Sequence, residues 1–298
     1  MLLALAPVFA QGDALPMTRI ERDPAVLGMA GASLSSSSSA AYSAFRSAAV
    51  LPFADMEMIA AGVGYQIWSP DLAKSQNLSA SVAYRLSDRF GISAGVVSQK
   101  GEAYDVFKAD GTPDGSYTPK DLVVAAGAGF AVTDGLSVGV NARYANQTLA
   151  EDVSYNGVSG DLWVLYRPLA ELSLTAGVST LGTQVTSASG KSYSQPASAV
   201  LAGSYRWDFA TDHRIEPCFT ADYYFSGNWG VSAGAEYAWK GLVHLRGGYR
   251  IASKEAVIPS HAAVGLGIHV KGVRVEAAWL TASKALGNTL TLGLVFVL

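Results

Sequence analysis

Apolar and polar residues alternate along the chain from about residue 56 to the C-terminus, in runs of about eleven residues that turn residues separate. Alternation of this kind places successive side chains on opposite faces of a β-strand. Fourteen such runs can be counted, an even number, as bacterial single-chain barrels require. They begin near Met56, Gln76, Arg89, Lys120, Leu136, Val158, Glu171, Ala197, His213, Trp229, Leu242, Ser260, Val273 and Asn288. The pattern predicts an all-β fold, a transmembrane antiparallel β-barrel of about 14 strands over residues 56–298.

The connections between the runs alternate in length. Short turns such as residues 87–88 and 240–241 alternate with longer connections such as residues 101–119 and 182–196, and the tight turn at 226–228 is an exception. Outer-membrane barrels have short periplasmic turns and longer external loops. We therefore expect both chain termini of the barrel to lie on the periplasmic side.

The last run shows how the faces are divided. Leu290, Leu292 and Phe296 fall on one side, and Thr289 and Thr291 fall on the other. The apolar side is expected to contact outer-membrane lipid. A soluble β-sandwich also alternates, but its outward face normally carries more charge.

Composition supports a membrane environment. Hydrophobic residues make up 50% of the chain and charged residues 15%, against roughly 25% charged in soluble domains. No stretch reaches the roughly 20 apolar residues of a membrane-spanning helix. The net charge of −3 gives no basic surface for nucleic acid.

Few residues are of the types and spacings that form disulfides, metal sites or catalytic sites. The single cysteine, Cys218, excludes a disulfide framework, and the four histidines lack the close spacing of a metal site. Gly127 and Gly129 lie within an alternating run, where they favour close packing or curvature over phosphate binding. We expect no metal, no cofactor and no enzymatic activity, although a dispersed Ser/His/acid set in the barrel is left open.

The N-terminal region has a different texture. Residues 1–10 (MLLALAPVFA) have the apolar core and small-residue end of a signal peptide, although the usual basic start is missing. A buried apolar arm is the other interpretation. Residues 11–55 are Ser-rich and do not alternate, and we expect them to form a short plug-like segment in the lumen.

Charged residues fall mainly on the predicted lumen side. By the parity of the alternation, a group on strands nine to eleven and thirteen faces inward: Asp222, Glu236, Arg246, Arg250, Arg274 and Glu276. Buried charges persist when they are paired. The group is consistent with ion pairs that fill the lumen, or with a selectivity site in a channel.

A family resemblance begins within the N-terminal segment. The matching residues are Leu27, Gly28, Met29, Gly31 and Tyr42. This stretch resembles the N-terminal region of the PorV/PorQ family, part of the wider FadL-like superfamily of outer-membrane proteins. Members follow the tyrosine with an Asn-Pro-Ala motif, which residues 43–49 of this chain lack.

The resemblance implies a fourteen-stranded barrel from a Bacteroidota-like outer membrane. It implies a non-catalytic accessory subunit of a secretion or assembly complex, such as type IX secretion, with other outer-membrane or surface proteins as partners. The alternative is a FadL-like passive channel for small hydrophobic compounds, with an apolar tunnel or a lateral opening.

The long loop at residues 101–119 is the candidate partner contact. Its aromatic residues Tyr104, Phe107 and Tyr117 are of the type that carries affinity in protein interfaces. A loop with incidental aromatic residues is the other interpretation.

Overall fold

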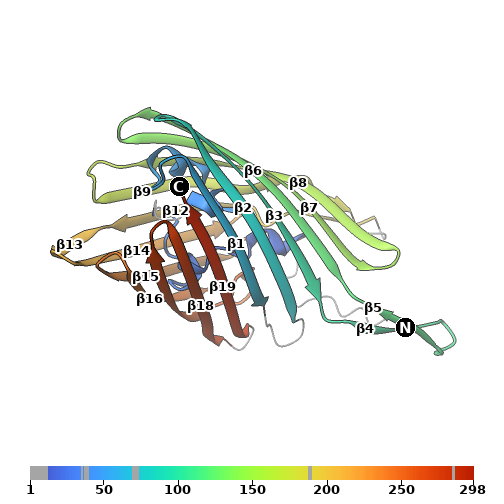
Figure 1. Cartoon of the computed structure of the whole chain (residues 1–298). Helices are drawn as coiled ribbons and strands as arrows, with labels where there is room; N and C mark the ends of the chain where they lie inside the picture. Colours follow the sequence, from blue (N-terminus) through green and yellow to red (C-terminus); the bar gives the residue numbers. More distant parts are fainter. Residues whose placement is uncertain (1–12, 35, 37–39, 69–73, 187–189, 284–285) are drawn as a thin grey trace.

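The structure is a computed structural model in which one closed β-barrel encloses the short helices that precede its first strand (Figure 1). It describes residues 13–34, 36, 40–68, 74–186, 190–283 and 286–298, so the expected signal peptide lies outside the described residues. The barrel strands are β1 (Ile59–Trp68), β2 (Ser75–Ser87), β3 (Phe90–Gly101), β6 (Lys120–Thr133), β7 (Leu136–Ala150), β8 (Val153–Tyr166), β9 (Leu172–Gly182), β12 (Ser198–Tyr205), β14 (His213–Tyr224), β15 (Trp229–Trp239), β16 (Val243–Ala252), β17 (His261–Val270), β18 (Val273–Ser283) and β19 (Gly287–Val297).

Every neighbouring pair of barrel strands is antiparallel, and the first and last strands close the ring. β1 pairs with β19 from Ala60 opposite Val297 to Ile67 opposite Leu290. The short strand β13 (Trp207–Ala210) continues β12 along β14. The predicted all-β barrel of about fourteen strands is confirmed.

The two faces of the wall differ as the alternation predicts. On β19, Leu290, Leu292 and Phe296 are exposed outward, while Thr289 and Thr291 are buried inside. The same division holds on the other strands, so large apolar side chains cover the outside of the barrel. This surface is suited to lipid hydrocarbon and not to water.

Replacing Leu292 with arginine tests which solvent surrounds the wall. Leu292 is 48% exposed near the middle of β19, and an arginine near the bilayer midplane costs about 2–4 kcal/mol of barrel stability. We expect that loss in the free energy of unfolding, measured by denaturant titration in lipid vesicles. The control Leu169→Arg, in the exposed turn between β8 and β9, is expected to cost less than about 1 kcal/mol. Equal losses for both variants would contradict the assignment.

The N-terminal segment lies inside the ring, where Figure 1 shows it in blue. Its short elements are η1 (Pro16–Arg19), α1 (Pro24–Leu27), η2 (Ala40–Phe45) and η3 (Ala48–Phe53). α1 packs on β17 to β19, η2 on β1, β2, β3 and β6, and η3 on β3 and β6 to β8. Because these strands lie on different sides of the ring, the segment spans the lumen. Among the described helices, none is long and apolar enough to cross a membrane.

Glycines on the inner wall allow this close fit. A Cβ atom added at Gly129 or Gly139 would overlap the backbone of Ala48 or Ala49, and one at Gly248 would overlap the backbone of Met29. Only glycine permits such an approach of two backbones. The N-terminal segment is therefore in direct contact with the wall and leaves no layer of side chains between them at these points.

Polar contacts fix the segment further. Asn141 on β7 donates to the carbonyl oxygens of Ser43 (2.9 Å) and Ala44 (3.0 Å) and accepts from the amide of Ala48 (3.1 Å). One wall side chain thus satisfies three backbone groups that the short helices leave unpaired.

Two of the longer connections contain small hairpins of their own. Residues 101–119, expected as a loop, include β4 (Tyr104–Phe107) and β5 (Pro113–Tyr117), which pair with each other and extend away from the barrel (Figure 1). β10 (Val185–Thr186) pairs with β11 (Ser192–Tyr193) in the connection between β9 and β12.

Candidate functional site

A small chamber lies inside the barrel between the N-terminal segment and the wall. Its volume is about 130 Å³. Apolar side chains from both parts line it, among them Leu27, Phe45, Trp68, Trp163 and Leu280. Charged and polar side chains share the lining, chiefly Arg19, Arg143, Asp222, Arg250 and His261. The chamber is thus amphipathic, with room for a compact small molecule.

One group of paired charges borders the chamber on β14 and β16. Nη2 of Arg250 lies 2.8 Å from both carboxylate oxygens of Asp222, and its Nη1 lies 3.2 Å from the hydroxyl oxygen of Ser232 on the strand between. Arg19 approaches the same carboxylate at 3.6 Å and lies over the Tyr224 ring at 5.3 Å. Asp222 therefore ties the N-terminal segment to the wall.

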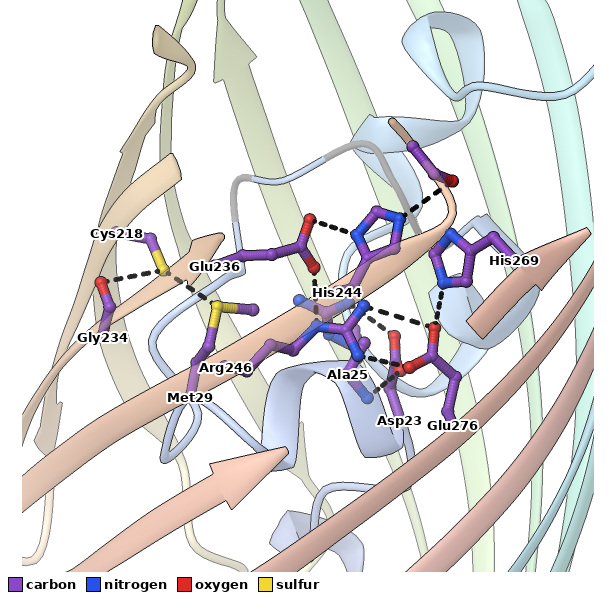
Figure 2. Close-up of polar contacts among 12 residues, drawn as sticks. Asp23, Ala25, Met29, Cys218, Gly234, Glu236, His244, Arg246, His269 and Glu276 are labelled. Atoms are coloured by element: carbon purple, nitrogen blue, oxygen red, sulfur yellow. Dashed lines mark hydrogen bonds and ion pairs between the residues drawn. The ribbon is translucent and has the colours of Figure 1, made fainter. Parts of the chain in front are cut away.

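A second group of paired charges lies toward the short turns on β15 to β18 (Figure 2). Nε of Arg246 donates to Glu236 at 2.6 Å, and its Nη1 and Nη2 donate to Glu276. Nδ1 of His244 lies 2.9 Å from Glu236, and Nε2 of His269 lies 2.6 Å from Glu276. The two imidazole rings stack with their centroids 3.7 Å apart.

Five of the six charges expected in the lumen thus divide into two groups. Asp222 and Arg250 form one pair, whereas Glu236, Arg246 and Glu276 form the other network. The sixth, Arg274, is the second residue of β18, opposite His269 in the ladder, and lies 3.7 Å from Asp55. None of the described groups of His, Cys, Asp or Glu side chains has the arrangement of a metal site.

A third ion pair, between Arg143 and Asp161, lies at an irregularity in the pairing of β8 with β9. Arg143 on β7 pairs with Asp161 on β8 in a bidentate contact and also donates to the carbonyl oxygen of Phe45 in the N-terminal segment. Oδ1 of Asp161 accepts the amide of Thr180 at 2.7 Å and the hydroxyl of Ser179 at 3.1 Å. Thr180 has a φ of 59°, a left-handed conformation that a β-branched residue rarely adopts.

The irregularity shifts the register of β8 against β9 between Gly160 and Leu162. β9 pairs with β12 only up to Ser179 opposite Ser198. A bulge of this kind bends the strand and ends its regular pairing. The Asp161 carboxylate therefore fixes the point at which the wall opens between β9 and β12.

A groove of about 890 Å³ lies at this point. Outward-facing Val158, Leu181 and Phe225 line it together with Ser159 and Gln195, which are buried. Side chains from both faces of the wall thus meet in one hollow.

Asp13 places the N-terminal segment at the groove. It forms a bridge with Ser194, and its carboxylate lies 3.4 Å from the hydroxyl oxygen of Ser226. Partial burial raises the pKa of Asp13, while the Ser226 hydrogen bond and the charge of Arg19 oppose that shift.

The residues that carry the family resemblance make packing contacts. Gly28 lies against Gly265 on β17, and a Cβ on Gly62 of β1 would lie 2.9 Å from the ring of Tyr42. Sδ of Met29 lies 3.6 Å from the Cys218 thiol, Leu27 ends α1, and Gly31 has a φ of 83°. In this structure these residues shape the N-terminal segment and seat it on the wall.

Alternation alone missed several residues of the site. Asp161 occupies an inward position opposite Asn141, so strand parity was a signal that could have found it. Arg19 and Arg46 could not be placed in this way, because they lie on a segment without periodicity. His244 shares the inward face of β16 with Arg246, so parity could have placed it inside, but its contact with His269 depends on strand register.

The chain is similar to known proteins in its structure. No family model matches the chain, and no curated protein does. Among solved structures, the CymD monoaromatic hydrocarbon channel is 13% identical to this chain with a TM-score of 0.63. The match covers 93% of this chain and 97% of the CymD chain. The Pseudomonas putida toluene transporter TodX is 14% identical with a TM-score of 0.61, and the match covers 97% of this chain and 98% of the TodX chain. A Pseudomonas aeruginosa FadL homologue is 11% identical with a TM-score of 0.59, and the match covers 93% of this chain and 98% of the homologue.

The fold is that of the FadL-type outer-membrane channels. The protein is accordingly a barrel of the bacterial outer membrane, in contact with lipid. The FadL-like part of the expected resemblance is confirmed at the level of the fold. The PorV/PorQ family, a Bacteroidota origin and type IX secretion stay predictions. CymD and TodX are described as a channel and a transporter, and the expected lack of enzymatic activity in this chain stays a prediction.

Proposed function

We propose that the protein is a passive outer-membrane channel for small hydrophobic compounds. The observation that carries the proposal is the groove at the end of β9, where outward-facing Leu181 and buried Gln195 line one hollow. A hydrophobic solute moving along the apolar outside of the barrel reaches polar interior groups there without crossing an intact strand pair.

The groove and the chamber are close neighbours along the chain. Ser179 lines the chamber, and Leu181, two residues further along β9, lines the groove. The bulge at Thr180 and the Arg143–Asp161 pair lie between them. We infer that this bulge is the gate of a path from the groove to the chamber.

The size of the chamber supports a small solute. An apolar protein cavity of about 150 Å³ accommodates benzene, and the chamber measures about 130 Å³. The similar structures CymD and TodX are described as a monoaromatic hydrocarbon channel and a toluene transporter. Both points favour a compound with a single ring.

Filling the groove tests the path. Ser226 is exposed in the external turn after β14 and lines the groove. The variant Ser226→Trp is expected to slow uptake of radiolabelled ethylbenzene several-fold, measured in cells whose outer membrane carries no other channel of this type. Glu102→Trp, exposed on the same rim but outside the groove lining, is the control and is expected to leave uptake unchanged. Equal uptake by Ser226→Trp and the unmodified protein would contradict the path.

A partner-binding role rests on a different observation. Phe107 is 59% exposed on the hairpin β4–β5, which Tyr104 and Tyr117 stiffen by a ring contact with centroids 6.0 Å apart. The comparisons favour the channel over an accessory subunit of a secretion complex, so this hairpin is a second proposal. Under it, Tyr104→Ala with Phe107→Ala weakens recovery of partner proteins from mild detergent without reducing barrel insertion, and unchanged recovery would contradict it.

A further inference from the structure

We propose that the chamber binds neutral, single-ring compounds that carry a hydrogen-bonding oxygen, such as an aromatic ketone, aldehyde or ether, in preference to hydrocarbons of the same size. This inference rests on the proposed function and names the substrate class of the same site. It concerns the polar part of the chamber lining, which passage of a pure hydrocarbon does not require.

Two buried donors in the lining have no hydrogen-bond partner in the part of the chain that the structure describes. The side chains of Trp68 on β1 and Trp163 on β8 are 3% and 4% exposed, and neither indole nitrogen has a hydrogen-bond partner among the described residues. An indole N–H can only donate. Since buried donors are nearly always paired in native proteins, each of these positions calls for an acceptor from water or ligand.

His261 adds an acceptor that the described part of the chain leaves unpaired. Its Nδ1 lies 2.8 Å from the carbonyl oxygen of Pro259, which can only accept, so Nδ1 carries the proton. In the neutral ring Nε2 then has a free lone pair, and this atom is buried with no partner among the described residues. A ligand hydroxyl or a ligand-bound water fits this position.

The charges around the chamber balance, which favours a neutral ligand. The arginines in the lining are equal in number to the carboxylates that line it or pair with those arginines. The two sets are Arg19, Arg46, Arg143 and Arg250, and Glu21, Asp23, Asp161 and Asp222. A bound carboxylate would add an uncompensated buried charge, which is costly.

The same groups disfavour a hydrocarbon. Entry of a ring into the chamber displaces water from the two indole donors and from Nε2 of His261. A hydrocarbon leaves them unpaired, whereas a ligand oxygen replaces one of the lost hydrogen bonds. The ring itself packs against Phe45 and Leu280 in either case.

Binding to the purified full-length barrel in detergent tests the substrate class. Ethylbenzene and acetophenone share a skeleton and differ by a methylene in place of a carbonyl, and benzoate supplies an anion. Each affinity is expressed relative to the ligand's partition into protein-free micelles. We expect acetophenone to bind roughly tenfold more tightly than ethylbenzene, and benzoate to bind more weakly than either.

Substitutions that keep the ring but remove the donor identify the groups responsible. Trp68→Phe and Trp163→Phe are each tested, and at least one is expected to lower the acetophenone preference by roughly threefold to tenfold. Trp279→Phe, on the outward face of β18, is the matched control and is expected to leave the preference unchanged.

The possible outcomes separate this inference from the proposed function. Equal binding of ethylbenzene and acetophenone, a preference that both chamber variants leave intact, or tighter binding of benzoate would overturn the substrate class while leaving a hydrophobic channel in place. Failure of the unmodified protein to bind any of the three would contradict the proposed function as well.

Discussion

Replacing Arg246 with methionine is expected to lower the free energy of unfolding by about 3–5 kcal/mol. Arg246 is the only residue that bonds to both Glu236 and Glu276 among the described contacts. Its side chain is 2% exposed, and both carboxylates are buried. Methionine fills a similar volume but leaves two carboxylates without their shared cation, and burying unpaired charge is one of the largest single destabilising changes.

An exposed ion pair supplies the control for this measurement. Arg214 and Asp208 lie 2.8 Å apart on β14 and β13, but both side chains are about half exposed. Exposed pairs contribute about 0–1 kcal/mol, so Arg214→Met is expected to change the unfolding free energy little. Denaturant titration in the same vesicles measures both variants. A loss of less than about 1 kcal/mol for Arg246→Met would show that the network does not stabilise the barrel.

Replacing Gly248 with valine is expected to displace the N-terminal segment and open the lumen to water-soluble solutes. A side chain at Gly248 would overlap the backbone of Met29, so the wall and the segment cannot both keep their positions. The wall is held by continuous ladders on both sides of β16, whereas the segment near Met29 is held by α1 and short turns. The segment therefore moves, and ion conductance of the barrel in planar bilayers is expected to rise.

The neighbouring glycine is a close control. Gly247 lies on the same strand, and a Cβ atom there would meet no atom within 4 Å. Gly247→Val makes the same change in strand propensity without touching the N-terminal segment, and its conductance is expected to match that of the unmodified protein. If Gly248→Val conducts no more than Gly247→Val, the segment does not close the lumen in the way proposed.

The sequence predicted the wall well because lipid and lumen impose a period of two on every strand. All fourteen expected runs correspond to strands, and β19 divides its faces as expected. The exceptions are local. β8 begins at Val153, five residues before the alternation becomes clear at Val158, and β4 and β5 pair with each other outside the barrel.

The interior was less predictable because its contacts join residues far apart in the chain. Parity placed Glu236, Arg246 and Glu276 inside, but strand register brings His244 and His269 to the same network. The bulge at Thr180 depends on an aspartate carboxylate nineteen residues earlier. Such features depend on non-local packing, which alternation along a single strand does not encode.

Uptake of a hydrophobic and a hydrophilic solute by the same cells tests the central claim most directly. Cells without another channel of this type would carry either the unmodified barrel or no barrel, with radiolabelled acetophenone and a small labelled sugar supplied in parallel. A passive channel closed along its axis by the N-terminal segment predicts faster uptake of acetophenone and unchanged uptake of the sugar. Acetophenone uptake that does not depend on the barrel, or a rise in sugar uptake, would contradict the account.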